Sequence, residues 1–71
     1  VGHAYTAELM SVALDENLKR AFGSALRALD ERTALARKLE KQASNSGRVR
    51  LAETWTSKAR ESEQEAAIIR D

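Results

Sequence analysis

The chain has 71 residues, 12 of them basic and 11 acidic, which gives a net charge of +1, and it contains neither cysteine nor proline. The lack of cysteine excludes disulfides and thiolate metal sites, and the balanced charge gives no general affinity for nucleic acid or acidic lipid. No apolar run approaches the ~20 residues that span a bilayer, so we expect a cytoplasmic module that neither inserts into a membrane nor binds nucleic acid.

The first predicted element is a helix that begins after Thr6. The Thr6 hydroxyl is suited to accept a hydrogen bond from a first-turn amide, and Glu8 places negative charge near the positive end of the helix dipole. The chain becomes more polar at 15–17, where Asp15 could itself begin a helix. Two alternatives therefore stay open: a short N-terminal helix that ends near Asp15, or one helix that continues through it.

A stripe of apolar residues at spacings of four and three predicts a long helix over 15–43. The stripe is interrupted only by Arg32 and is widened on its flanks. Its members are Leu18, Phe22, Ala25, Leu29, Ala36, Leu39 and Ala43, with Ala21, Ala28 and Leu35 on one flank and Leu26 on the other. Gly23 lies inside this helix and costs about 1 kcal/mol relative to alanine. It indicates either the close approach of another helix or a tolerated weakness.

A turn over 44–47 and a second helix over 48–70 complete the prediction. Serine and asparagine side chains compete with the helical hydrogen bonds there, and Gly47 suits the left-handed position after a helix. The second helix carries a narrow stripe of mostly small residues, which favours close antiparallel packing on the first helix. The stripe consists of Ala52, Trp55, Ala59, Ser62, Ala66 and Ile69, whereas Leu51 and Ile68 lie off its centre.

These elements predict an all-α fold: an antiparallel helical hairpin, with a short N-terminal helix as the open alternative, that associates into a helical bundle. Two narrow apolar stripes leave large side chains uncovered, and so small a chain rarely stabilises a core alone. We expect a second copy, or the catalytic domain of a parent protein, to cover them. The predicted contact residues are Leu18, Phe22, Leu29, Trp55 and Ile69. Phe22 and Trp55 are expected in the core, or, if both are exposed, in a groove for a partner helix.

No pattern in the chain indicates catalysis or a bound cofactor. None of its serines lies in a Gly-x-Ser-x-Gly turn, and its single histidine, His3, has no local partner for a metal or a nucleophile. The carboxylates of Glu61, Glu63 and Glu65 are interpreted as a solvated helix face. We therefore predict no enzyme activity, no cofactor and no metal site within residues 1–71.

Basic residues gather around the turn: Arg37, Lys38, Lys41, Arg48 and Arg50. The first three complement the negative end of the first helix without any ligand. A specific anionic partner is the alternative interpretation. Because no aromatic residue is interleaved with these charges, single-stranded nucleic acid is disfavoured as that partner.

Three segments of the chain resemble one known family. They are VGHAYT at 1–6, FGSALRALDE at 22–31 and GRVRLAETW at 47–55, and together they resemble the C-terminal extension of a subset of chemotaxis methylesterases of the CheB type. The opening hexapeptide is the most specific part. Three positions depart from the family pattern: Thr6 stands in place of serine, Ala7 in place of proline, and Gly23 in place of a bulky aromatic residue.

The resemblance implies that residues 1–71 are a single module cut from a longer protein, in agreement with a start at Val1 rather than methionine. It implies a non-catalytic accessory or oligomerisation module of a CheB-like two-component signalling protein. The parent would carry the glutamate methylesterase activity in a domain before Val1, followed by a cysteine-containing segment. If that segment binds a metal, His3 would be the one part of the site present here. The alternative function is an adaptor hairpin that binds a peptide or helix of another protein.

Overall fold

Two helices account for nearly all of the described chain. The computed structural model describes the backbone of residues 2–71 and the side chains of residues 6–71. Helix α1 spans Gly2–Asn45, helix α2 spans Val49–Arg70, and residues 46–48 connect them. The all-α prediction is confirmed for this part of the chain, which contains no strand.

Helix α1 begins earlier than predicted and is continuous. It starts at Gly2, so Thr6 lies inside the helix and not at its N-cap, and the predicted start after Thr6 is wrong. It also runs through Asp15 without a break, which leaves no separate short N-terminal helix. The physical reason is that no proline or cluster of turn-forming residues lies between Gly2 and Ser44, and a single polar residue such as Asp15 does not end a helix that continues on both sides.

The turn between the helices is a Schellman motif with glycine in the left-handed position. Gly47 has φ +73°, as its place in the sequence predicts. The Arg48 amide donates to the carbonyl of Ala43 at 2.8 Å, and the Gly47 amide donates to the carbonyl of Ser44 at 3.1 Å. These two bonds satisfy carbonyls that the end of α1 would otherwise leave unpaired. The reversal is therefore encoded locally.

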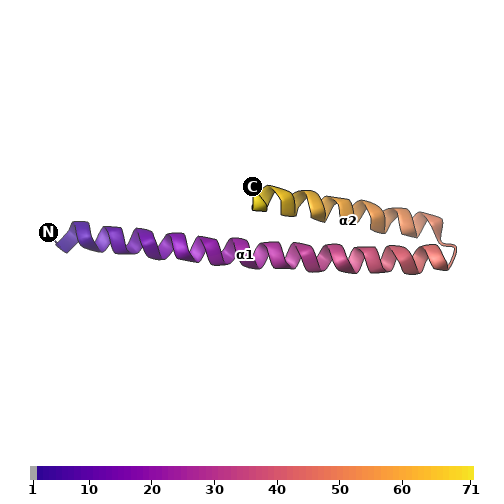
Figure 1. Cartoon of the computed structure of the whole chain (residues 1–71), viewed down its shortest axis with the longest axis horizontal. Helices are drawn as coiled ribbons and strands as arrows, with labels where there is room; N and C mark the ends of the chain where they lie inside the picture. Colours follow the sequence, from indigo (N-terminus) through magenta and orange to yellow (C-terminus); the bar gives the residue numbers. More distant parts are fainter. Residues whose placement is uncertain (1) are drawn as a thin grey trace.

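Helix α2 folds back antiparallel along α1 but covers only about half of it (Figure 1). At 1.5 Å per residue, the 44 residues of α1 extend over about 66 Å and the 22 residues of α2 over about 33 Å. The molecule measures 69 × 15 × 13 Å. The C-terminal end of α2 lies beside the middle of α1, where Arg70 pairs with Asp30. Within residues 2–71, no other helix lies beside the N-terminal half of α1.

The core between the helices consists of small side chains. The buried apolar residues are Ala36, Ala43, Ala59 and Ala66, and Ser62 is the largest side chain that is fully buried among those described. Small residues allow two helices to approach closely, as the predicted α2 stripe implies. The same smallness limits the apolar area that the hairpin removes from water.

The predicted stripes match the buried faces only where the two helices overlap. On α2 every stripe member is buried or half-buried. On α1 the same holds from Ala25 to Ala43, whereas Leu18 and Phe22 are exposed because α2 does not extend that far. Gly23 marks no close helix contact: a Cβ added there would meet only Arg27 Nη1 of the same helix, at 3.7 Å.

Candidate association surface

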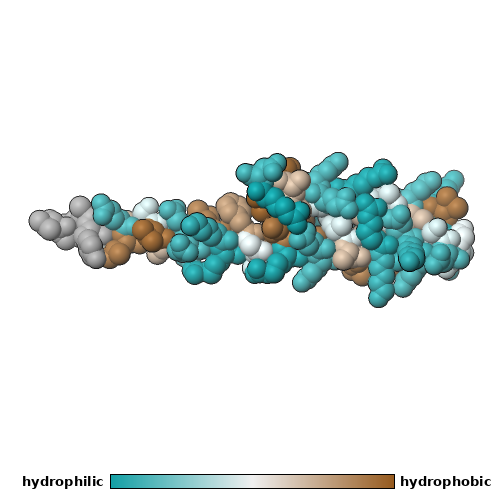
Figure 2. Space-filling view, viewed as in Figure 1, coloured by the Kyte–Doolittle hydropathy of each residue, from teal (hydrophilic) through white to brown (hydrophobic). Residues whose placement is uncertain are grey.

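The uncovered part of α1 presents large apolar side chains to solvent. Every described side chain over residues 6–22, here called the arm, is exposed. Met10, Leu14, Leu18 and Phe22 follow one another at four-residue intervals and so lie along one side of the helix. Figure 2 shows brown, hydrophobic patches along this single-helix half. Such a patch on a small polar protein is typical of an interaction surface.

The apolar side of the arm continues the face of α1 that packs on α2. Phe22, Leu29, Ala36 and Ala43 are seven residues apart, which keeps them on nearly the same side of the helix. Leu29 is half-buried and both alanines are buried beneath α2, whereas Phe22 is 57% exposed. The arm therefore carries the same kind of helix-packing face as the paired half, but without a helix on it.

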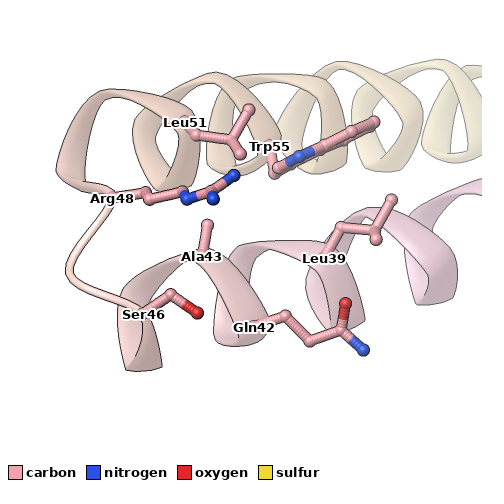
Figure 3. Close-up of a pocket in the computed structure, with 7 residues that line it drawn as sticks. All are labelled: Leu39, Gln42, Ala43, Ser46, Arg48, Leu51 and Trp55. Atoms are coloured by element: carbon pink, nitrogen blue, oxygen red, sulfur yellow. The ribbon is translucent and has the colours of Figure 1, made fainter.

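A groove of about 290 Å³ opens between the helices near the turn (Figure 3). Leu39 and Ala43 of α1 point toward α2, with Trp55 and Leu51 across from them. The residues that line the groove are Leu39, Gln42, Ala43, Ser46, Arg48, Leu51 and Trp55. The Lys58 ammonium nitrogen lies 5.9 Å from the centre of the Trp55 ring, within the range of a cation–π interaction. Three of the lining residues, Gln42, Ser46 and Arg48, are polar, and the Arg48 side chain lies between Leu51 and Ala43 (Figure 3), so the groove is only partly apolar.

The two ion pairs between α1 and α2 lie on one edge of the hairpin. Arg37 Nη2 is 3.0 Å from a carboxylate oxygen of Glu63, and Arg70 Nη2 donates to both carboxylate oxygens of Asp30 at 2.9 Å. Asp30 and Arg37 are seven residues apart, as are Glu63 and Arg70, so both pairs share a side. These side chains are exposed, and such pairs contribute little to stability.

Arg37 is held by two carboxylates. Its guanidinium donates to Glu63 on α2 and, at 3.1 Å, to Glu40 one turn further along α1. The hydrogen bond to Glu63, and then the one to Glu40, raise the pKa of Arg37. This part of the predicted basic cluster is therefore occupied by acidic partners within the chain, which leaves Arg37 less suited to an external anion.

On the opposite edge of the hairpin, α1 carries an apolar stripe. Leu14, Ala21, Ala28 and Leu35 recur every seven residues along α1 and are all exposed. Leu35 precedes Arg37 by two residues, which places the two side chains about 200° apart around the helix axis. The next position at this spacing is Gln42, which lines the groove. This second stripe therefore runs along α1 from the arm to the groove.

The residues predicted to make contacts fall into two groups. Leu29, Trp55 and Ile69 are half-buried between α1 and α2, whereas Leu18 and Phe22 lie on the arm. Trp55 packs near the turn, whereas Phe22 lies eight residues before Asp30, the partner of Arg70 at the end of α2, so the two aromatic residues form no common cluster. The sequence analysis placed Leu35 on a flank of the stripe without giving it a contact role; its spacing from Leu14 was the signal.

The described side chains that could act in catalysis or bind a metal do not lie together. Glu61, Glu63 and Glu65 are exposed, in agreement with a solvated face. No group of three or more histidine, cysteine or acidic side chains in the described part of the chain could hold a metal ion. The side chain of His3 lies outside the described residues.

One buried hydroxyl lacks a hydrogen-bond partner. Ser62 is fully buried against α1, and its Oγ forms no hydrogen bond. Thr33 and Thr56, which are half-buried, donate to the carbonyls four residues earlier, Leu29 and Ala52, at 2.9 and 3.0 Å. The neighbours of Ser62 on the α2 stripe, Ala59 and Ala66, offer no polar side chain. The unpaired hydroxyl therefore lowers the stability of the core at this position.

No protein-family model, curated protein or solved structure matches the chain. Over the described residues, neither helix combines the length and the apolar character needed to cross a bilayer.

Proposed function

We propose that the chain is a non-catalytic self-association module. The observation that carries this proposal is the distribution of apolar side chains: four alanines form the buried apolar core, while ten large apolar residues are exposed among those described. Burial of one large apolar side chain stabilises a protein by about 1.5–3 kcal/mol, so most of the available stabilisation is unused in a single chain. Association of two chains would bury these side chains and gain that stabilisation.

The arm provides a second argument for association. Isolated helices shorter than about 12–15 residues are marginal in water, and longer ones depend on tertiary packing for most of their stability. The arm has 17 residues, and over the described residues α2 does not reach it. A partner that covers Leu14, Leu18 and Phe22 would stabilise the helix and bury its apolar side.

Sedimentation equilibrium of the wild-type chain and of two matched arm variants tests the proposal. Leu18 and Leu9 are 54% and 53% exposed, but nine positions separate them, which places them on opposite sides of the helix. Leu18→Gln should weaken association at least about tenfold, or about 1.4 kcal/mol, whereas Leu9→Gln should leave it unchanged. A wild-type chain that is a folded monomer at micromolar concentration would refute the proposal.

We further propose that the module belongs to a cytoplasmic, CheB-like two-component signalling protein. The resemblance of residues 1–6, 22–31 and 47–55 to the extension of chemotaxis methylesterases supports this assignment. The coding sequence upstream of Val1 tests it. A methylesterase or response-regulator domain there would support the assignment, and any other domain would contradict it.

The groove at Trp55 favours one alternative, an adaptor that binds a helix of another protein. Its recess of about 290 Å³ beside Leu39 and Leu51 could accept an apolar anchor from such a helix. Trp55 is the only tryptophan, so its fluorescence reports directly on occupation of the groove. A spectral shift with a heterologous helix, in a chain that remains monomeric, would favour the adaptor function.

A further inference from the structure

The second stripe on α1 has a symmetric order of residues: leucine, alanine, alanine, leucine. Its residues, at seven-residue intervals, are Leu14, Ala21, Ala28 and Leu35, all of them exposed. Two such helices placed antiparallel bring Leu14 opposite Leu35 and Ala21 opposite Ala28, and the reverse pairs follow by symmetry. A two-fold interface must be self-complementary in this way. The two alanine pairs at its centre allow the helices to approach, and a leucine pair lies at each end.

From this stripe we infer the geometry of the assembly: two copies pair with their α1 helices antiparallel, and the arm of each copy lies along the other hairpin as its third helix. The inference rests on the proposed self-association and adds the partner, the orientation and the register.

The lengths of the elements fit this arrangement. The stripe is centred between residues 24 and 25, and α1, which spans Gly2–Asn45, is centred between residues 23 and 24. The two α1 helices therefore overlap over almost their whole length. In this register the arm, residues 6–22, lies beside residues 27–43 of the second copy, the half of α1 that also carries α2. Each end of the dimer then contains three helices.

The groove receives a side chain in the same register. The pairing that places Leu14 opposite Leu35 also places Met10 of the second copy opposite Leu39, which lines the groove with Leu51 and Trp55. Met10 is 61% exposed in the single chain. Its flexible, unbranched side chain suits the apolar part of the groove, which Leu39, Leu51 and Trp55 form.

The two edges of the hairpin differ in character, and only one of them suits the apolar arm. One edge carries the ion pairs Arg37–Glu63 and Asp30–Arg70, and the opposite edge carries the second stripe and leads into the groove. An arm on the apolar edge contacts α1 through Leu14 and turns Leu18 toward α2 of the second copy. In the C-terminal half of α1, the apolar face is covered by α2 of the same chain. In the N-terminal half, the same face is then covered by α2 of the second copy.

Cysteine cross-linking tests the register, because the full chain has no native cysteine. Ala21→Cys and Ala28→Cys are prepared separately, oxidised alone and as an equimolar mixture, and compared with Ser57→Cys, an exposed position on α2 outside the proposed interface. We expect a covalent dimer in the mixture and none in either variant alone, since residue 21 faces residue 28. About half of the dimers in the mixture contain one chain of each kind, which sets the upper yield.

Other outcomes separate this inference from the proposed function. A dimer in which Ala21→Cys cross-links to itself would show a parallel pair, and a dimer with no more cross-linking than Ser57→Cys would show another register. Either result overturns the geometry and keeps self-association. If both variants sediment as monomers while the wild type is a dimer, Leu14→Cys and Leu35→Cys replace them in the same design. A monomeric wild type overturns both proposals.

Discussion

Replacement of Ser62 by alanine should stabilise the protein. Ser62 is fully buried and its hydroxyl has no hydrogen-bond partner. An unsatisfied buried hydroxyl costs about 1–3 kcal/mol, and alanine has a helix propensity about 0.5 kcal/mol better than serine. The sum is a gain of about 1.5–3.5 kcal/mol in the free energy of unfolding. For a domain of this size each kcal/mol raises the melting temperature by about 4–8 °C, so the expected rise is at least about 6 °C.

Ser57→Ala is the matched control for this prediction. Ser57 lies on the same helix but is exposed, so its replacement should give only the propensity gain, about 2–4 °C. Thermal melts followed by circular dichroism are run for all chains at one concentration, because association makes the melting temperature concentration-dependent. If Ser62→Ala gains no more than Ser57→Ala, the Ser62 hydroxyl is hydrogen-bonded in solution and the argument from burial fails.

Three further substitutions test the turn, the arm boundary and the ion-paired edge. Gly47→Ala should cost about 1–2 kcal/mol in urea titrations, because Gly47 has φ +73° although no atom would touch the added methyl group. Gly23→Ala should instead gain up to about 1 kcal/mol, since its Cβ would make an ordinary contact with Arg27; equal signs for the two glycines would contradict this account. Glu63→Gln should leave the melting temperature almost unchanged, because its pair with Arg37 is exposed, and a clear loss would mean that the pair is buried in an assembly.

Local signals in the sequence were sufficient to predict the turn and the buried face of α2. Gly47 follows a run of residues that end helices, and its φ and the two hydrogen bonds of the Schellman motif agree with that prediction. The α2 stripe from Ala52 to Ile69 was predicted from spacing alone, because a helix of 22 residues with one narrow apolar face has only one side to bury.

The exposure of Phe22 and Leu18 could not be predicted from the same periodicity. Phe22 precedes Leu29 by seven residues, just as Leu29 precedes Ala36, and α2 covers only the latter two. What differs is the position of the end of α2 along α1, which depends on the turn at Gly47 and on the length of α2. A stripe defines which side of a helix is apolar, but only the register between helices defines how much of that side is buried.

The start of α1 was missed for a related reason. Thr6 has the side chain of a helix cap, but a cap matters only where the preceding backbone leaves the helix, and α1 already includes Gly2. Similarly, Asp15 is a residue type that often begins a helix, but α1 runs through it without a break. Cap residues therefore mark positions that can end a helix, and the surrounding residues decide whether the helix ends there.

Under the proposed self-association, the small core and the long arm make folding and association depend on each other. A hairpin whose buried apolar residues are alanines gains little from packing, and its conformational entropy cost is about 1.5 kcal/mol for each ordered residue. The side chains able to offset that cost, such as Leu14 and Leu18, lie where no part of the same chain can reach them. A second chain that covers them contributes to the core of both copies. The proposed interface would therefore also supply the missing part of the hydrophobic core.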